Sequence, residues 1–211
     1  MIVLTFGTEE AKLKRLMESA GFHIENLGVG LEFTGLMQKV HRVNRFLRDV
    51  SGDEEVLFVD GYDVVFSERD CWQGIKERFR ASGAEVLVSA ERNCYPYPIE
   101  AEYPACHTPY RFVNSGSYIG YCGALRRLFA DMRVERIPAY VNDQAVFTDF
   151  YLFRGGFVLD HEANLFQSLF AAEGDLRRDG EGYINTVTGS RPLILHGNGG
   201  VDMDNFLNRG E

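Results

Sequence analysis

The chain has 211 residues, of which 45% are hydrophobic and 25% charged, and it carries a formal net charge of −9. This length and hydrophobic content fit one domain, residues 1–211, with a substantial core. The acidic balance argues against nucleic-acid-binding and anionic-membrane-binding functions, because such surfaces gather lysine and arginine.

Targeting and redox features are sparse. No segment approaches the ~18 apolar residues of a membrane span. The N-terminus, MIVLTFGTEE, is typical of a first strand rather than a signal peptide, so we expect a cytoplasmic chain with no membrane partner. The four cysteines, Cys71, Cys94, Cys106 and Cys122, lack the C-x-x-C spacing of a zinc site. Free thiols are expected, and a Cys94–Cys106 bridge would form only in an oxidising compartment.

Strand and helix patterns alternate through the first half of the chain. Apolar runs predict strands over 1–6, 23–30, 56–59 and 84–91, and helical spacing predicts helices over 9–21, 35–50 and 68–83. This alternation predicts an α/β fold with a parallel sheet covered by helices. Ligands of such sheets bind beyond the carboxyl ends of the strands, where Asp60 and Glu91 are expected.

The second half is less regular. Residues 92–111 hold four of the six prolines and four tyrosines, which predicts a long aromatic loop of the kind that is often functional. A strand is expected over 111–121, helices over 124–132 and 141–153, a strand within 157–169, and another within 192–200.

The run VLFVDGYDVVF, which starts at Val56, places Asp60 and Asp63 inside one of the most apolar stretches of the chain. A buried carboxylate needs a compensating partner, and a cation is the first candidate. Both carboxylates can reach one ion only if the strand turns after Asp60, which we expect Gly61 to permit through its backbone freedom. Such a site suits Mn²⁺ or Mg²⁺ in contact with phosphate. The alternative is a turn-capping aspartate pair between two strands.

A second apolar strand, PLILHGNGG, ends in the potential ligand His196 and continues directly into a glycine-rich turn. Glycines let backbone N–H groups approach a phosphate closely. Imidazole beside carboxylates moves the metal preference from Mg²⁺ toward Mn²⁺. A single histidine at a strand end is otherwise a structural residue, but the combination with Asp60 and Asp63 favours the ligand role.

The combined pattern resembles the glycosyltransferase domain of procollagen lysyl hydroxylases, a GT-A domain that transfers glucose from UDP-glucose to galactosyl-hydroxylysine with Mn²⁺. The similar stretches run in order from Thr5 to Gly199: LTFGT, GLMQKV, VLFVDGYDVVF, VSAERNCYPYP, RFVNSGSYIGY, NDQ, LDHEANLFQSL and PLILHGNG. The resemblance implies a GT-A fold, with a Rossmann-like and mainly parallel central sheet, and a sugar-transfer module standing alone.

The resemblance also assigns site residues. It implies Asp60, Asp63 and His196 as metal ligands, with Mn²⁺ preferred and Mg²⁺ a substitute. It implies a nucleotide-sugar site in which Tyr62 stacks on the uracil, and that site comprises Phe6, Thr8, Lys39, Tyr62, Asn114, Ser115, Gly197, Asn198 and Gly199. Without the resemblance, Lys39 would be an exposed helix lysine, and the Asn114–Ser115–Gly116 run a turn beside a strand.

The catalytic residues implied are Asp143, Asn142 and Tyr95. Asp143 is the surviving carboxylate of an acidic run that the family has before its glutamine, where this chain has Asn142 and Asp143. The alternative is that Asn142 or Asp143 caps a helix. Two further departures are Tyr95, where the family has tryptophan, and the acidic VDMD stretch around Asp202, where it has lysine. These departures bear on acceptor choice, transfer rate and donor affinity.

The resulting hypothesis is a Mn²⁺-dependent, retaining glycosyltransferase. It would move a hexose, glucose in the first place, from a UDP-sugar to a hydroxylysine-linked galactose or a similar hydroxyl acceptor. The same fold transferring galactose to hydroxylysine is one alternative, and a nucleotide-sugar-binding module without transfer activity is another. A Mg²⁺-dependent phosphatase is disfavoured, because LTFGT offers no aspartate nucleophile after the first strand.

Overall fold

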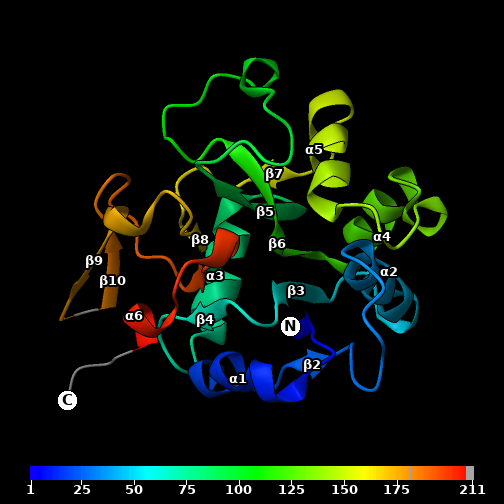
Figure 1. Ribbon diagram of the computed structural model, residues 1–211, viewed down its shortest axis with the longest axis horizontal. Helices are drawn as coiled ribbons and strands as arrows, with labels where there is room; N and C mark the ends of the chain where they lie inside the picture. The colour runs from blue at the N-terminus through cyan, green and yellow to red at the C-terminus, as the bar shows by residue number, and fades with distance from the viewer. Residues whose placement is uncertain (181, 208–211) are drawn as a thin grey trace.

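The computed structural model describes residues 1–180 and 182–207, and a central sheet with helices on both faces organises them (Figure 1). Its strands, in spatial order, are β2 (Glu25–Asn26), β1 (Ile2–Phe6), β3 (Glu55–Asp60), β6 (Phe112–Tyr121), β5 (Val86–Glu91) and β7 (Val158–Leu159). The pairings of β1 with β2 and β3, and of β5 with β7, are parallel. Strand β6 is antiparallel to both of its neighbours, β3 and β5.

The reversal of β6 is a difference from the parallel sheet that the alternating pattern predicted. The chain between β5 and β6 is the loop 92–111, which contains a 3₁₀ turn, Glu100–Glu102, and no α-helix. Parallel neighbours need a crossover connection, usually helical, so a strand that follows such a loop returns antiparallel. The sheet is therefore mixed, although three of its five pairings are parallel.

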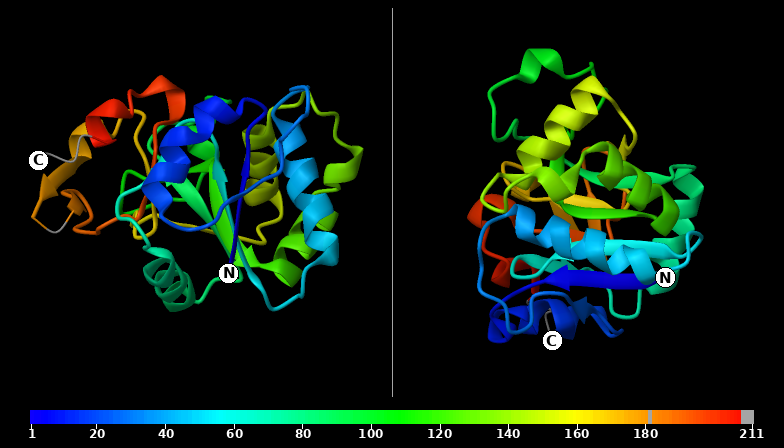
Figure 2. Two further views of the ribbon diagram at one scale, coloured as in Figure 1. Left: turned by 90° about the horizontal axis from the view of Figure 1, so that it is seen from below. Right: turned by 90° about the vertical axis from the view of Figure 1, so that its right-hand side faces the viewer.

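Alternation along the strands separates two cores. In β3, Val56 and Phe58 face one core, while Leu57 and Val59 face the other. The first core is covered by α2 (Met37–Phe46), α4 (Cys122–Asp131) and α5 (Asp143–Phe153), and the second by α1 (Lys14–Ala20) and α3 (Trp72–Ser82). The left view of Figure 2 places α1 and α3 on one side of the strands, and α2 and α4 on the other.

Two of the helix ends follow from glycine. Gly21 after α1 and Gly83 after α3 both adopt the left-handed backbone, with φ of 76° and 68°. Only glycine enters this region without a steric penalty, so it is the usual residue just beyond a helix. The predicted stop of the first helix at Gly21 is confirmed.

A smaller sheet lies beside the central one and carries part of the site. It consists of β4 (Val64–Phe66), β11 (Ile194–His196) and β8 (Phe166–Ser168), with β11 in the middle. Strand β11 is antiparallel to β4, and His196 lies opposite Val64. Beyond it lie the hairpin of β9 (Leu176–Asp179) and β10 (Gly182–Asn185) and the short helix α6 (Asp204–Leu207).

Three further expectations concern the loop, the thiols and the membrane. The loop 92–111 is irregular, as predicted, and forms the upper rim of the view in Figure 1. All four cysteines carry free thiols, including Cys94 and Cys106. Over residues 1–180 and 182–207, no helix combines the length and the apolar character that crossing a membrane requires.

Candidate functional site

The two aspartates of VLFVDGYDVVF lie on either side of a turn. Strand β3 ends at Asp60 and β4 begins at Val64, so the strand does turn after Asp60, as convergence of the two carboxylates requires. The expected reason for Gly61 is wrong, because its φ is not positive. The space around Gly61 is tight instead: a Cβ there would lie 2.5 Å from Leu13 Cδ2 and 3.1 Å from the Phe6 carbonyl oxygen.

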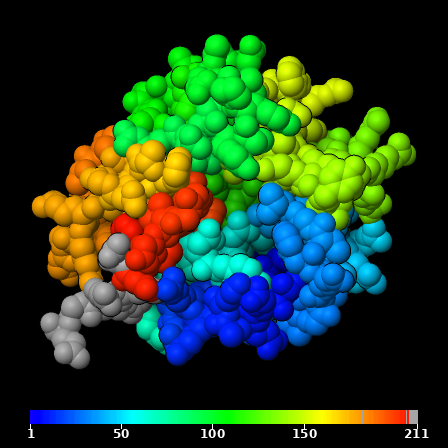
Figure 3. Space-filling view, in the orientation of Figure 1, coloured from blue at the N-terminus to red at the C-terminus, as the bar shows by residue number. Residues whose placement is uncertain are grey.

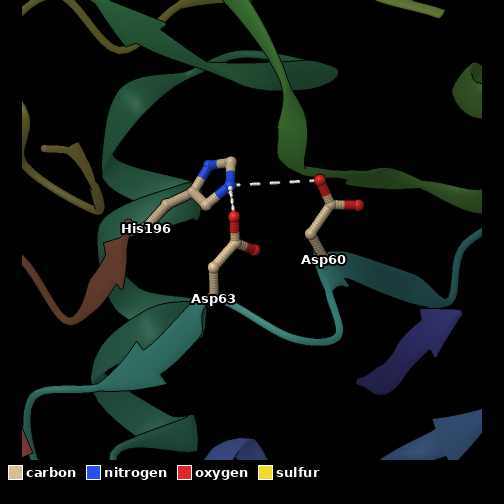
Figure 4. A group of neighbouring side chains, drawn as sticks. All are labelled: Asp60, Asp63 and His196. Carbon is tan, nitrogen blue, oxygen red and sulfur yellow. Dashed lines mark ion pairs between the residues drawn. The ribbon is translucent and has the colours of Figure 1, made fainter. Parts of the chain in front are cut away.

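Pairing between β4 and β11 brings His196 to the same turn. The Gly197 N–H donates to the Asp63 carbonyl oxygen at 2.7 Å, which fixes the two strand ends together. His196 Nε2 lies 3.4 Å from Asp63 Oδ2 and 4.0 Å from Asp60 Oδ2, and Figure 4 shows the imidazole directed at both carboxylates. One ligand atom from each residue lies within 4.8 Å of the others, so the three form a candidate metal centre.

Burial and mutual attraction act against each other within this cluster. Burial opposes the charged imidazole of His196, but the Asp63 and Asp60 carboxylates outweigh it and raise its pKa above 6.5. Burial likewise opposes charge on Asp63, yet His196 leaves the pKa of that carboxyl lowered. For Asp60 burial prevails, and its pKa is raised despite Lys39 and His196. The ionised form of Asp60 is thus the least well compensated.

Lys39 is a buried cation rather than an exposed helix lysine. Its Nζ donates to Asp60 Oδ1 at 2.7 Å and Oδ2 at 2.9 Å, and lies 3.1 Å from Asp143 Oδ2. The last contact is an ion pair, and Asp143 Oδ2 has no hydrogen-bond partner among the described residues. Burial works against the ammonium charge, but Asp143 and Asp60 outweigh it, so the pKa of Lys39 is raised.

The start of α5 separates the two readings of Asn142 and Asp143. The Asn142 side chain is the cap, since its Oδ1 accepts the Ala145 N–H at 3.1 Å. Its Nδ2 donates to the Tyr95 hydroxyl at 3.1 Å, which links α5 to the aromatic loop. Asp143 takes no part in capping. It is 3% exposed, and its carboxylate instead contacts Lys39 and lines the adjoining cavity.

These groups line a cavity of about 480 Å³. Of the residues assigned from the sequence, it is lined by Lys39, Asp60, Asp63, Tyr95, Asn114, Ser115, Asn142, Asp143, His196, Asn198 and Gly199. Figure 3 shows a hollow at the centre of this face, between the green aromatic loop, the red C-terminal segment and cyan atoms. Residues from both halves of the chain therefore meet in one depression.

A second cavity of about 270 Å³ continues from the first and shares Leu36, Lys39, Asp60 and Asp63 with it. Its remaining lining residues are Phe6, Thr8, Phe33, Gly61 and Tyr62, three of which belong to the predicted nucleotide site. The Tyr62 hydroxyl accepts the Glu9 N–H at 2.9 Å, and its ring is partly exposed to the cavity. An aromatic wall thus stands on one side of the candidate metal centre.

Gly197, a predicted site residue, and Asp202, a departure from the family pattern, both lie outside the two cavities. The backbone N–H of Gly197 instead bonds to the Asp63 carbonyl oxygen. A Cβ on Gly197 would lie 2.4 Å from Met203 Sδ. The Oδ1 of Asp202 accepts the Asp204 N–H at the start of α6.

Several cavity residues escaped assignment from the sequence: Leu36, Phe33, Asn93, Gly116, Gln144, Phe170 and Glu91. Glu91 stood at a predicted strand end, which was a signal for a site residue. Nothing in the sequence points to Gly116, because it matters only through residues packed against it in the fold. A Cβ there would lie 2.2 Å from His196 Cε1 and 2.8 Å from Asp60 Oδ2.

The cluster fits a divalent cation on the chemistry of its donors. Asp60, Asp63 and Asp143 bring three carboxylates against Lys39 and one imidazole, so the site has room for further positive charge. Carboxylate and imidazole together suit Mn²⁺ better than Mg²⁺. Gly116 leaves the space between His196 and Asp60 free of a side chain.

Comparison with known proteins agrees with this architecture. Residues 1–209 match the family model described as the PLOD GT domain. The chain is 30% identical to mouse procollagen-lysine,2-oxoglutarate 5-dioxygenase 1 and 28% identical to human multifunctional procollagen lysine hydroxylase and glycosyltransferase LH3. In both cases the match covers 98% of this chain and 31% of the relative, so the chain spans about a third of their length.

Solved structures show the same fold at low identity. The galactosyltransferase LgtC, in complex with donor and acceptor sugar analogs, superposes with a TM-score of 0.58 at 12% identity, over 95% of this chain and 88% of LgtC. Apo mouse xyloside xylosyltransferase 1 gives a TM-score of 0.54 at 13% identity, over 95% of this chain and 98% of the other. The predicted α/β GT-A fold is confirmed, and the chain belongs to the PLOD GT domain family, as a GT-A glycosyltransferase domain of the lysyl hydroxylase type.

Proposed function

We propose that this chain is a Mn²⁺-dependent, retaining transferase that moves a hexose from a UDP-sugar to a hydroxyl acceptor. Glucose is the proposed sugar, and a hydroxylysine-linked galactose or similar glycan the proposed acceptor. One observation carries the proposal: two cavities share Asp60 and Asp63, which form a candidate metal centre with His196, in a chain of this family. Residues 1–211 would act as one domain.

The donor would extend across the candidate metal centre. Tyr62, with Phe6 and Thr8, would hold the uracil in the smaller cavity, where an aromatic face can stack on a base. Lys39, at the junction of the cavities, would attract the diphosphate. When bound by Asp60, Asp63 and His196, Mn²⁺ would supply Lewis-acid stabilisation of the negative charge on the departing UDP.

The hexose would occupy the larger cavity near Asn114, Ser115 and Asp143. A hexose held against these buried side chains would be shielded on that face from water that could hydrolyse the donor. A carboxylate at Asp143 can hold the acceptor hydroxyl or stabilise positive charge that develops on the sugar ring. Tyr95 and Asn142, at the exposed side of the cavity, would contact the acceptor.

An assay of UDP release from UDP-glucose and UDP-galactose, with Mn²⁺ and with or without galactosyl-hydroxylysine, tests this proposal. We expect turnover with a UDP-hexose that requires the divalent ion and increases with the acceptor. Transfer of galactose to hydroxylysine itself would identify the alternative reaction on the same site. Binding of UDP-sugars with no turnover on any acceptor would contradict the proposal and indicate a non-catalytic module.

A further inference from the structure

A buried carboxylate behind the candidate metal centre takes no part in the proposed chemistry. Glu91, the last residue of β5, is 2% exposed and lies at the wall of the larger cavity. Burial raises the pKa of its carboxyl, while hydrogen bonds from amide side chains act in the opposite direction. A buried carboxylate is retained only where its hydrogen bonds are satisfied, so these partners explain its presence.

Three amide side chains from three different segments donate to Glu91. Its Oε1 accepts from Gln144 Nε2 at 2.6 Å and from Asn114 Nδ2 at 3.1 Å, and its Oε2 accepts from Asn198 Nδ2 at 2.9 Å. Gln144 belongs to α5, Asn114 to β6, and Asn198 to the turn after β11. One carboxylate therefore connects α5 and β6 to the turn beside His196.

The oxygen of each of these amides accepts a hydrogen bond from a backbone N–H group. Asn114 Oδ1 accepts from Gly116 N at 3.0 Å, Gln144 Oε1 from Ser115 N at 3.4 Å, and Asn198 Oδ1 from Leu169 N at 3.0 Å. Exchanging the oxygen and nitrogen of any of these amides would set donor against donor and acceptor against acceptor. Glu91 and the backbone together fix the orientation of all three.

The Asn114 amide transmits this orientation to the candidate metal ligand. Asn114 Oδ1 also lies 3.1 Å from His196 Nδ1, and a carbonyl oxygen can only accept, so Nδ1 must carry the hydrogen. The neutral imidazole then has its lone pair on Nε2, the nitrogen that faces Asp63 and Asp60.

We propose that Glu91 is a positioning residue, which sets the His196 tautomer through Asn114 and so prepares Nε2 to bind a divalent cation. The proposal rests on the proposed function only in assuming that Asp60, Asp63 and His196 hold a metal. Residues that orient a metal-binding histidine typically change metal affinity 10–100-fold when they are replaced.

Glu91→Gln tests this role with little change in shape. Wherever the new amide nitrogen lies, it faces at least one of the three donors, so the network cannot be satisfied. We expect the Kd for Mn²⁺ alone, measured by calorimetry without UDP-sugar, to rise about tenfold. Glu55→Gln is the matched control, because Glu55 is also a buried glutamate but lies at the far end of β3 with Arg80 as its partner. The Mn²⁺ affinity of this variant should equal that of the wild type.

A spectroscopic measurement separates positioning from general loosening of the fold. Long-range ¹H–¹⁵N NMR of the metal-free protein in alkaline buffer, with His196 assigned by its loss in His196→Asn, should report the Nδ1–H tautomer in the wild type. Glu91→Gln should show a mixture of tautomers. Asn114→Ala, which cuts the link but leaves Gln144 and Asn198 on Glu91, should weaken Mn²⁺ binding equally, and the double variant should lose no more.

Wild-type Mn²⁺ affinity and an unchanged His196 tautomer in Glu91→Gln would overturn the proposal. If that variant fails to fold, the same two results in Asn114→Ala would overturn it. Neither readout involves a sugar donor, so failure of the positioning role is distinguishable from failure of the proposed transfer reaction, which is judged by wild-type turnover.

Discussion

The two ends of strand β3 carry buried carboxylates with different surroundings. Glu55 at the start is 4% exposed and pairs with Arg80 Nε at 2.6 Å, with Lys76 Nζ at 3.9 Å from its other oxygen. Asp60 at the end shares its surroundings with Asp63 and Asp143, against Lys39 and His196. The first charge is matched by cations from α3, whereas the second belongs to a group with an excess of carboxylates.

This contrast distinguishes a structural charge from a functional one. A carboxylate that only stabilises the fold needs partners within the protein that satisfy its charge and its hydrogen bonds. A cluster that keeps more carboxylates than cations gives up stability in the metal-free state, and such a cluster is expected where a ligand supplies the missing charge. Substitutions of the carboxylates at the two ends of β3 should therefore have different effects on activity and stability.

The largest expected effect is loss of a candidate metal ligand. Asp63→Ala should reduce UDP-hexose turnover by roughly a thousandfold or more, because metal stabilisation of transition-state charge is worth several kcal/mol. Steady-state UDP release with Mn²⁺ measures the loss, and Glu55→Gln should retain near-normal rates. Full turnover of Asp63→Ala, or of the wild type in EDTA, would contradict a metal-binding role for the Asp60 end of β3.

Asp143 tests whether the third carboxylate acts in the reaction. Asp143→Asn should keep UDP binding and lose on the order of a hundredfold in turnover, as expected for a carboxylate that acts only in the transition state. Asn142 already supplies the helix cap, so the stability of α5 should not decide the outcome. Turnover within a fewfold of the wild type would leave Asp143 as a simple partner of Lys39.

Tyr62 tests the aromatic wall on the far side of the cluster. Stacking on a base is worth ~1–3 kcal/mol, so Tyr62→Ala should weaken UDP binding about tenfold or more. Calorimetry with UDP and ADP measures this, and the wild type should prefer UDP. Equal affinities for the two nucleotides would place the base elsewhere.

The smallest expected effect is on stability, and its sign differs between the two ends of β3. Asp60→Asn keeps an amide oxygen that can accept from Lys39, leaves Lys39 paired with the Asp143 charge and His196 with Asp63, and removes a carboxylate whose pKa burial has raised. The metal-free variant should gain ~1 kcal/mol, or roughly 2–4 °C in Tm. Glu55→Gln should instead lose stability. A melting temperature that falls equally in both variants would contradict the idea of a charge excess at Asp60.

Much of the fold and the three candidate metal ligands could be predicted from local patterns in the sequence, whereas the other site residues are assigned from the resemblance to the lysyl hydroxylase glycosyltransferase domain. The helices and strands of the first half follow hydrophobic spacing. Asp60 and His196 stand at the ends of apolar strands, and Asp63 directly precedes one. The reversal of β6 depends on how the loop 92–111 returns the chain, which periodicity does not report. The crowding at Gly61 and Gly116 comes from side chains distant in sequence, Leu13 and His196, so only the packed structure reveals it.

Anomalous X-ray diffraction from crystals grown with Mn²⁺ and UDP would locate the bound metal ion directly. We expect one strong manganese peak within coordination distance of Asp60, Asp63 and His196 Nε2, with the diphosphate completing its coordination and the uracil against Tyr62. A manganese peak at another position, or UDP bound in these cavities with no metal at the three ligands, would contradict the account.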